Sequence, residues 1–595
     1  MLNGSKYCII GMEITFVFRY DMINKLQNAF SDSQLVQSFS GVRTVMGFGP
    51  DISAEHHVLA MVYGYYYAVK FLSSKPTATV LLGRDPRPTG KTLVRALGHG
   101  FLAGAAAAGT KLTLTNLGII TTPLAETAVR ALKADGGVMV TASHNPIDSN
   151  GFKFLSGCEW EMPNSAPAGA LLSSAMMAEL IKDVANAKDI TEFVNKFDPV
   201  DVDTTLHDQI HDLQRVIAER AYLDGIGLDW GLTPHCLKPY TLGPVLLDPN
   251  GGAGCGIGAR VLNHFGVRVI EVNAETGQPE HGIDTDGIDP ANGRHMLLRV
   301  ARAAARERTH FGVAFDYDAD RGNMVLPGDN ESAILPAQRV ATFNIALLLT
   351  HRQLQGTSER PLAVVVSDAT SLASHRVAEA FGAQVFQVET GEINVVTKMD
   401  SLRKEGYDVP IGVEGANGGT IFASATCRDG LQVALGAAQA ESTPILAKTM
   451  LEVLNKVVKH GLDPEEPVSL TELVSAVPMF HNVMSKVKSP PLAQSIIKKK
   501  LEKIFIENYW QKISDRFGSY LFENFEGTTV GPQRSGDESG AWRILLQSPT
   551  RSAFIFLRGS RTEPGVWRTI IDASDGDDFA LLQNVASELF KEGFA

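Results

Sequence analysis

The sequence predicts an α/β protein with three similar mixed α/β domains and a smaller C-terminal α+β domain. Two observations support this prediction. An apolar strand, a glycine-containing turn and a helix alternate in three separate regions, and such alternation is typical of βαβ units. Nearer the C-terminus the pattern changes to consecutive strands followed by one helix. The 595 residues leave room for about four domains at roughly 150 residues each.

The first region of alternation is expected to form domain 1, over residues 38–240. Its expected elements are strands at Ala78–Gly83, Lys111–Leu117 and Val138–Val140, with a helix at Thr92–Ala108 and another ending at Ala134. A polar, acidic stretch and a helix-like run, residues 163–221, follow this pattern and are expected to end the domain. Residues 1–37 are expected to be an N-terminal extension.

The same alternation returns twice and sets the remaining boundaries. The second set is Gly243–Leu247, Gly258–Phe265 and Val267–Val272, and the third is Leu362–Ser367, Leu372–Phe381 and Gln384–Val388. We therefore expect domain 2 over residues 241–332 and domain 3 over residues 333–470. The C-terminal α+β domain is expected over residues 471–595, with strands at Trp542–Gln547 and Ala553–Leu557 and a helix at Phe579–Phe590.

The composition excludes several classes of protein. With 44% apolar and 20% charged residues, the chain is an ordinary globular protein. Its net charge of −12 does not favour nucleic acid or anionic lipid as a partner. The five cysteines contain no CxxC pair and indicate a reducing compartment. No apolar stretch reaches the roughly 18 residues of a membrane span, so a cytoplasmic protein without a membrane partner is expected.

The first chemical cluster is Thr141–Pro146, directly after an apolar strand. A serine in a proline-terminated turn at a strand end is well placed to face a cleft. Ser143 needs a neighbouring base or a positive field to act as a nucleophile, and His144, Lys153 and Arg43 are the candidates. Taken alone, the cluster is better explained as a structural Asn-Pro turn with a capping serine.

The second cluster places three carboxylates at alternate positions of one short loop after a strand. Asp316, Asp318 and Asp320 can converge on one hard cation, and a tight oxygen-rich loop suits Mg²⁺. An EF-hand is excluded because Arg321 and Pro327 stand where that loop requires Gly and Glu. The alternative is a solvated acidic turn.

The third cluster, Arg558–Pro564, follows another apolar strand. A guanidinium from Arg558 and hydroxyls from Ser560 and Thr562 can hold a phosphate, although a surface turn is an equal alternative.

The fourth cluster, Gly412–Gly419, is rich in glycine, which lets backbone approach a ligand. Glu414 and Asn417 can bind hydroxyl groups from this loop. GxSxG, Walker A and GxGxxG motifs are absent from the sequence, which removes the usual support for hydrolase, P-loop and Rossmann functions.

The four clusters, in this order, resemble the α-D-phosphohexomutase superfamily, which includes phosphoglucomutase, phosphomannomutase, phosphoglucosamine mutase and phosphoacetylglucosamine mutase. The resemblance runs from about Ser38 to the C-terminus and includes Gly41–Arg43 and Gly83–Arg87. It implies four domains around one central cleft. It also implies an intramolecular phosphotransferase of the isomerase class, which interconverts hexose 1-phosphate and hexose 6-phosphate through a phosphoserine and a bisphosphate intermediate.

The resemblance assigns a role to each candidate residue. Ser143 would carry the phosphoryl group and contribute to the Mg²⁺ site, and Asp316, Asp318 and Asp320 would be the metal ligands. The other implied roles are His144, Lys153 and Arg43 at the transferred group, Arg321, Arg558, Ser560 and Thr562 at phosphate, and Glu414 and Asn417 at the sugar hydroxyls. A hexose bisphosphate would be the activator. Glucose or mannose phosphates are the first expected substrates, ahead of amino sugars, and the protein is expected to be a monomer or a dimer.

The sequence departs from the family pattern at three places. Many relatives have Glu-x-Ser-Gly-His where this chain has Glu414–Gly418. Tyr317 replaces a usual glycine of the metal loop, and Arg561 replaces a usually small residue of the phosphate loop. The alternatives are a sugar-bisphosphate synthase or phosphopentomutase of the same fold, or a non-catalytic sugar-phosphate-binding relative. For the segment Gly83–Arg87 a structural turn and a functional role have equal standing, and the segment is left out of the catalytic set.

Overall fold

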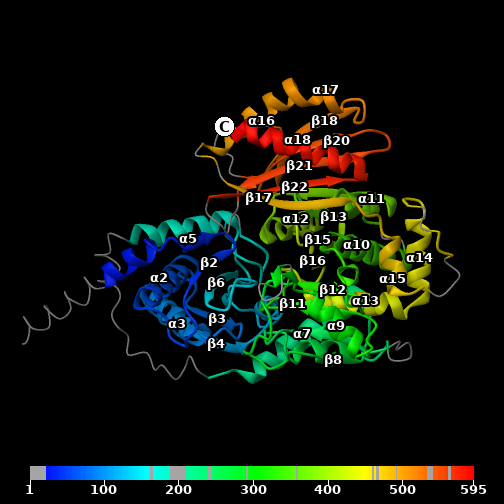
Figure 1. Cartoon of the computed structure of the whole chain (residues 1–595). Coiled ribbons are helices and arrows are strands. Elements are labelled where there is room, and N and C mark those ends of the chain that lie inside the picture. The colour runs from blue at the N-terminus through cyan, green and yellow to red at the C-terminus, as the bar shows by residue number, and fades with distance from the viewer. Residues whose placement is uncertain are drawn as a thin grey trace, which may run out of the picture.

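The structure is a computed structural model in which the chain forms four packed units, numbered 1 to 4 in chain order (Figure 1). Unit 1 is blue, unit 2 is green, unit 3 is yellow-green to yellow, and unit 4 is orange to red. The structure describes residues 22–594 except residues 161, 163–164, 188–208, 238–242, 286, 290–292, 357–358, 459–460, 464–467, 489, 491, 533–539 and 560–564.

Unit 1 contains a six-stranded sheet with the order β1-β2-β6-β5-β3-β4. The strands are β1 (Val36–Ser38), β2 (Gly41–Val45), β3 (Thr77–Arg84), β4 (Lys111–Ile119), β5 (Gly136–Val140) and β6 (Ser149–Ser156). The helices are α2 (Ala54–Phe71), α3 (Gly90–Ala107), α4 (Thr122–Ala131) and α5 (Ser174–Asn186). Helices α2 and α3 approach closely because Gly100 has no side chain: a Cβ there would lie 2.0 Å from the Met61 carbonyl oxygen.

Unit 2 contains a four-stranded sheet with the order β12-β11-β7-β8. Its strands are β7 (Val245–Asp248), β8 (Val269–Glu271), β11 (Gly312–Phe315) and β12 (Gly322–Val325). Its other elements are α8 (Ile257–Phe265), α9 (Leu298–Arg306), the hairpin β9 (Ile288–Asp289) and β10 (Arg294–His295), and the 3₁₀ turn η4 (Glu331–Ala333). The strands β7 and β11 are fully buried apolar runs, as expected for parallel strands covered on both faces.

Unit 3 repeats this plan with the strand order β14-β13-β15-β16. Its strands are β13 (Leu362–Ser367), β14 (Gln384–Val388), β15 (Asp408–Glu414) and β16 (Gly419–Phe422). Its helices are α10 (Ala337–Leu354), α11 (Leu372–Ala380), α12 (Glu392–Lys404), α13 (Gly430–Ser442), α14 (Pro444–Leu454) and α15 (Leu470–Ala476).

The sheets of units 1 to 3 share one topology. In each, a central strand has a parallel neighbour on both sides, and a fourth strand pairs antiparallel with the third. One loop joins the third strand to the fourth in every unit. Including the strand-end residues that flank two of them, we name these segments the serine loop (residues 141–149), the metal loop (residues 316–321) and the glycine loop (residues 414–419). Each begins at the carboxyl end of a parallel strand, where α/β sheets place their ligands.

Unit 4 is an antiparallel sheet with the order β17-β22-β21-β20-β18-β19. The strands are β17 (His481–Lys488), β18 (Ser519–Glu526), β19 (Thr529–Gly531), β20 (Trp542–Gln547), β21 (Ser552–Gly559) and β22 (Val566–Ala573). The helical elements are α16 (Gln494–Ile504), the π-helical turn η5 (Phe505–Tyr509), α17 (Trp510–Ile513) and α18 (Gly576–Phe594). The predicted fold class, three similar α/β units and a different C-terminal α+β unit, is confirmed.

Helix α7 (Asp212–Trp230) joins units 1 and 3. It packs against α4 of unit 1. At its other end, the Trp230 indole nitrogen donates to Gln432 Oε1 at 3.1 Å in unit 3. A Cβ on Gly436 would lie 2.5 Å from the Trp230 ring, so glycine is required at this contact. One apolar core consequently runs through units 1, 2 and 3.

Some segments near the expected domain boundaries pack with a neighbouring unit. Helical residues 22–30 bury Met22 and Leu26 in the core of unit 1, although the N-terminal extension was expected over residues 1–37. Leu473 of α15 lies in the core shared by units 1 to 3, so unit 4 begins beyond this helix. The expected boundary at residue 240 lies outside the described residues. Among the described residues, none of the helices combines the length and apolar character needed to span a bilayer.

Candidate active site

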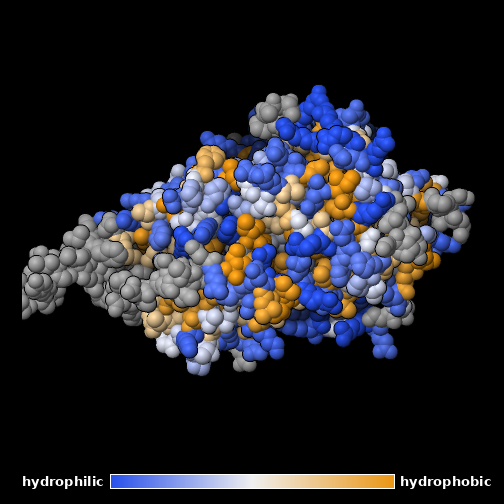
Figure 2. Space-filling model, turned by 90° about the horizontal axis from the view of Figure 1, so that it is seen from below, coloured by the Kyte–Doolittle hydropathy of each residue, from blue (hydrophilic) through white to orange (hydrophobic). Residues whose placement is uncertain are grey.

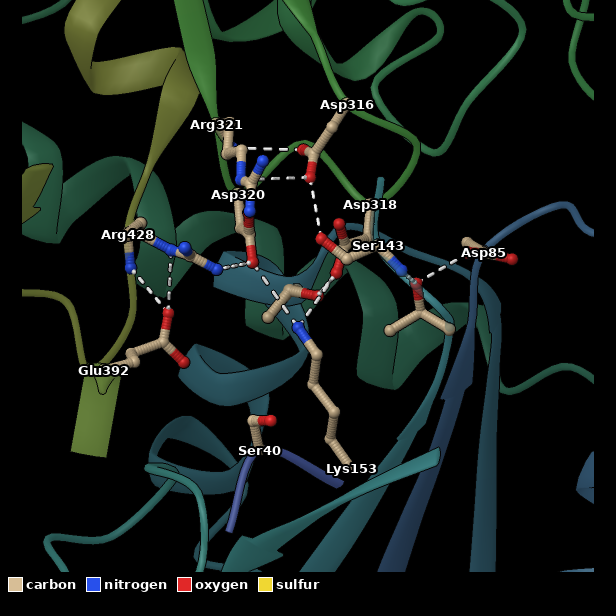
Figure 3. A network of polar contacts seen from close by, with 12 residues as sticks. Ser40, Asp85, Ser143, Lys153, Asp316, Asp318, Asp320, Arg321, Glu392 and Arg428 are labelled. Carbon is tan, nitrogen blue, oxygen red and sulfur yellow. Dashed lines mark hydrogen bonds and ion pairs between the residues drawn. The ribbon is translucent and has the colours of Figure 1, made fainter. Parts of the chain in front are cut away.

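Ser143 lies in the serine loop of unit 1 and is 2% exposed. Its backbone φ of 52° is in the left-handed region, which is uncommon for a residue other than glycine. Its N–H donates to Thr141 Oγ1 at 2.8 Å, and its hydroxyl donates to Asp316 Oδ2 of the metal loop, also at 2.8 Å (Figure 3). Backbone strain of this kind occurs most often at functional residues. The hydroxyl of unit 1 therefore faces the carboxylates of unit 2.

Arg87 holds the shape of the serine loop, and its side chain is fully buried. Its guanidinium donates to four loop carbonyls: Ser143 (2.7 Å), Asn145 (2.6 Å), Ser149 (2.8 Å) and Pro146. Its Nε lies 3.1 Å from Asp85 Oδ2, which also accepts a hydrogen bond from Thr141 Oγ1 at 2.6 Å. The segment Gly83–Arg87, which was left out of the catalytic set, thus supports the loop that carries Ser143.

The metal loop brings three carboxylates together between β11 and β12. Asp316, Asp318 and Asp320 are buried, and one oxygen from each lies within 4.8 Å of the others. Lys153 Nζ, from β6, lies 3.1 Å from Asp318 Oδ2 and 3.4 Å from Asp320 Oδ2 (Figure 3). Thr122, at the start of α4, donates its hydroxyl to Asp318 Oδ2 at 2.7 Å. Unit 1 thus contacts the metal loop from three of its elements.

Arg428 joins this cluster to unit 3 from the segment between β16 and α13. Its guanidinium lies 2.7 Å from Asp320 Oδ2, 2.9 Å from Glu414 Oε2 and 3.2 Å from Glu392 Oε2. Burial alone would raise the pKa of Asp320, but Arg428 and Lys153 hold that pKa well below its usual range. The pKa of Asp316 is raised well above its usual range by burial and by its carboxylate neighbours.

The metal loop fits a Mg²⁺ ion. Asp318 Oδ1 and Asp320 Oδ1 are buried and have no hydrogen-bond partner. Buried carboxylate oxygens without partners are costly, so two such atoms in one cluster indicate a missing cation. Oxygen ligands from a few carboxylates, with positions left for phosphate oxygens, are what Mg²⁺ prefers. Asp316, Asp318 and Asp320 are therefore the residues that would hold the ion.

The glycine loop lies beside the metal loop. With its amide oxygen turned toward the Arg321 guanidinium, Asn417 accepts from Arg321 Nε at 2.8 Å. Gln338 of α10 donates to the Ala416 carbonyl at 2.8 Å and fixes the backbone of the loop. Gly418 has a φ of 64°, and a Cβ there would lie 2.3 Å from the Ala337 carbonyl oxygen. The two residues expected to bind sugar hydroxyls, Glu414 and Asn417, are therefore both paired with arginines.

Arg43 and His144 are two more candidate residues close to Ser143. Arg43, in β2, donates to the Ser40 carbonyl at 3.2 Å, and its buried Nε has no hydrogen-bond partner. The positive charge of Arg321, then burial and the charge of Arg43, hold the pKa of His144 well below its usual range. His144 is therefore neutral, and its buried Nδ1 has no hydrogen-bond partner.

The fourth expected loop belongs to unit 4. Arg558 is at the end of β21 and donates to the Thr390 carbonyl of unit 3 at 3.4 Å. Burial lowers the pKa of Arg558, whereas Asp368 and Glu389 of unit 3 raise it. Its buried Nε has no hydrogen-bond partner and is available to an anion. Ser560 and Thr562 lie outside the described residues.

Sequence reasoning missed Arg428, Glu392 and Arg87. Arg87 belongs to a segment that was considered, but nothing local showed that its guanidinium reaches a loop about sixty residues away. Arg428 and Glu392 carry no motif, because each is a single charged residue next to a helix start. Their roles come from contacts between units.

Comparison with known proteins matches two of the units to one family. Residues 36–167 match the family model of phosphoglucomutase/phosphomannomutase, alpha/beta/alpha domain I, and residues 343–460 match domain III of the same family. These segments fall on units 1 and 3, whose serine and glycine loops belong to the site.

Whole-chain relatives agree with this match. A phosphoglucosamine mutase of Bartonella henselae is 25% identical over 462 residues, which cover 77% of this chain and 83% of the relative. A phosphoglucosamine mutase of Brucella ovis is 28% identical over 396 residues, covering 65% and 74%. The crystal structure of a phosphoglucomutase/phosphomannomutase family protein from Burkholderia thailandensis has the same fold, with a TM-score of 0.61, 18% identity and coverage of 94% and 97%.

The fold and the site define a multi-domain α/β protein with a serine, an acidic metal loop and several buried cations in one place. The matches confirm the resemblance that the motifs predicted: units 1 and 3 match domain models of the phosphoglucomutase/phosphomannomutase family, and most of the chain is similar to phosphoglucosamine mutases.

Proposed function

We propose that this chain is a Mg²⁺-dependent phosphohexomutase that interconverts hexose 1-phosphate and hexose 6-phosphate through a phosphoserine at Ser143. The observation that carries the proposal is the 2.8 Å contact between Ser143 Oγ and Asp316 in a buried, acidic metal loop. Phosphoryl transfer needs mainly positioning and charge neutralisation. A serine, three metal-binding carboxylates and nearby cations supply both.

The reaction needs two phosphoryl transfers in opposite directions. In the first, the Oγ–P bond of phosphoserine breaks and a bond forms from phosphorus to the free hydroxyl of a hexose monophosphate, which gives a bisphosphate. In the second, Ser143 Oγ attacks the other phosphate, and the opposite monophosphate leaves. Mg²⁺ held by the three aspartates would neutralise charge on the transferring oxygens. Lys153, Arg43 and Arg321 add fixed positive charge around the same group.

Proton transfer accompanies each step. The sugar hydroxyl loses a proton when it attacks phosphoserine, and a neutral imidazole can accept it. We assign this role to His144, which follows Ser143 in the serine loop and whose buried Nδ1 has no hydrogen-bond partner. In the second transfer the Ser143 hydroxyl, which donates to Asp316 Oδ2, loses its proton as it attacks, and in each transfer the departing oxygen takes up the proton that the attacking hydroxyl released.

The sugar is the finer part of the proposal. Glu414 would bind sugar hydroxyls, with Arg428 fixing its carboxylate at 2.9 Å. Arg558 would hold the phosphate that is not reacting. We place hexosamine phosphates first because the relatives in Bartonella henselae and Brucella ovis are phosphoglucosamine mutases. Glucose and mannose phosphates, the first expectation from the sequence, come next.

The test follows the phosphorus resonances of sugar phosphates. Purified protein is incubated with Mg²⁺, a trace of hexose bisphosphate, and separately the 1-phosphates of glucosamine, glucose, mannose and ribose. We expect one hexose 1-phosphate to become its 6-phosphate. Ser143→Ala should lower that rate at least about a thousandfold, because the nucleophile is lost. Ser475→Ala is the matched control, since this hydroxyl only donates to the Thr471 carbonyl on an exposed helix.

Other outcomes favour the alternatives. Conversion of ribose 1-phosphate alone indicates a phosphopentomutase. Accumulation of bisphosphate with consumption of a second phosphoryl donor indicates a synthase. Binding of a sugar phosphate without any conversion, and without phosphate on Ser143 by mass spectrometry, contradicts the mutase and leaves a binding protein.

A further inference from the structure

Tyr317 is the aromatic residue of the metal loop and lies between Asp316 and Asp318. Its side chain is fully buried, and its hydroxyl oxygen has no hydrogen-bond partner. A tyrosine that leaves its hydroxyl unpaired in the interior contributes through its ring.

The ring of Tyr317 lies against Arg87 of unit 1. The guanidinium carbon of Arg87 is 5.3 Å from the centre of the ring, within the range of a cation–π interaction. Arg87 is completely shielded from water, and such contacts are strongest when they are desolvated. The aromatic ring therefore stabilises a cation that donates to four carbonyls of the serine loop.

The two loops thus touch in two ways. Asp316 contacts Ser143 Oγ directly, and Tyr317, the next residue, reaches the same loop through Arg87. The second link is needed because Ser143 has a φ of 52°. This backbone conformation is unfavourable for a serine and must be held by the surrounding contacts. A small shift of the serine would misplace its oxygen for in-line transfer.

We propose that Tyr317 is a positioning residue that locks the serine loop to the metal loop through the face of its ring and Arg87. The proposal rests on the proposed function for its kinetic consequence, but not for its structural one. The Tyr317 ring couples units 1 and 2 in a way that a residue without an aromatic side chain cannot.

Two variants distinguish a role of the aromatic ring from a role of the hydroxyl group or of apolar packing. Tyr317→Phe keeps the aromatic face and removes the hydroxyl, whereas Tyr317→Leu keeps a buried apolar side chain and removes the aromatic face. We expect kcat of Tyr317→Phe to remain within about twofold of the native value. Tyr317→Leu should lower kcat about tenfold and change KM for the sugar phosphate less than twofold, because the sugar contacts other loops.

Hydrogen exchange gives a readout that does not need the activity. The amides of Ser143, Asn145 and Ser149 form hydrogen bonds within the serine loop. We expect them to exchange at least about tenfold faster in Tyr317→Leu than in Tyr317→Phe. Phe311→Leu is the matched control, since it also removes a fully buried ring from unit 2 and should leave the serine loop unchanged.

The outcomes are decisive in both directions. Equal exchange in the Leu and Phe variants overturns the proposal, and so does faster exchange of the serine loop in Phe311→Leu. A low kcat in both Tyr317 variants would assign the effect to the hydroxyl and also overturn it. If the native protein converts no sugar phosphate, the proposed function fails, while the exchange experiment still decides the role of Tyr317.

Discussion

The two halves of the candidate site are built differently. Units 1 and 2 meet at the serine and metal loops through Ser143, Lys153 and Thr122, all bonded to buried aspartates. Among the described residues, two side chains of unit 3 bond to the metal loop, Arg428 and Asn417. The loops that would carry the chemistry are therefore held by side chains from several elements of unit 1. The part of the site that would bind the sugar contacts the metal loop through these two side chains of unit 3.

The difference suggests how one protein can hold a reactive group rigidly and still accept two orientations of a sugar. Phosphoryl transfer depends on fixed geometry, since an error of about 1 Å costs much of the rate. Recognition of either phosphate end instead needs a site that adapts. The following changes test this contrast, from the largest expected effect to the smallest.

The largest effect is expected at the metal loop. Asp318→Asn removes one charge from the trio and should weaken Mg²⁺ binding at least about tenfold by calorimetry, with activity falling about a hundredfold or more. Chelation of Mg²⁺ should abolish activity reversibly. Asp329→Asn, an exposed acid of the same unit, is the control. Unchanged Mg²⁺ affinity in the Asp318 variant would show that this loop is not the metal site.

A smaller effect is expected at the link between the halves. Arg428→Lys keeps the charge, but a single ammonium group cannot bridge Asp320, Glu414 and Glu392 as the planar guanidinium does. Activity should therefore fall about tenfold. KM for the sugar phosphate should rise, because Glu414 loses its fixed partner. Arg260→Lys, at an exposed pair with Glu219, should leave both values unchanged. A fall in kcat at constant KM would place Arg428 in the chemical half instead.

The smallest effect concerns the contact of unit 1 with unit 3. Glu126 of α4 is fully buried, and its Oε2 accepts from Thr426 Oγ1 of unit 3 at 2.7 Å. Burial, with the neighbouring charge of Glu392, raises the pKa of Glu126 to about 8. The folded protein therefore keeps a proton that the unfolded chain releases near pH 4.5.

The pH dependence follows from this difference. The stabilising contribution of the protonated group is complete below about pH 4.5 and is lost as pH rises toward 8. Glu126→Gln mimics the protonated form, so the native protein should lose more stability than the variant between pH 5 and pH 8, on the order of 1 kcal/mol or more. Thermal unfolding of both proteins measures this. Parallel curves would show that Glu126 does not take up the proton.

Figure 2 shows the molecule from below. Orange patches lie between blue ones over this side of the molecule, where α7 runs along the lower edge of Figure 1. The sequence predicted a helix-like run here, but only the packing shows that it bridges units 1 and 3 while Leu213 and Val216 stay exposed.

The sequence by itself determined the order of the elements and the loops that carry chemistry. Strand, turn and helix are local patterns. Ser143 and the three aspartates lie in loops that begin at a strand end, and Glu414 is the last residue of its strand. The tertiary structure alone decided which distant groups support them. Arg87 reaches a loop 56 residues ahead, and Arg428 bonds an aspartate 108 residues before it. Contacts of this kind depend on how units pack, and packing leaves no periodic trace in the chain.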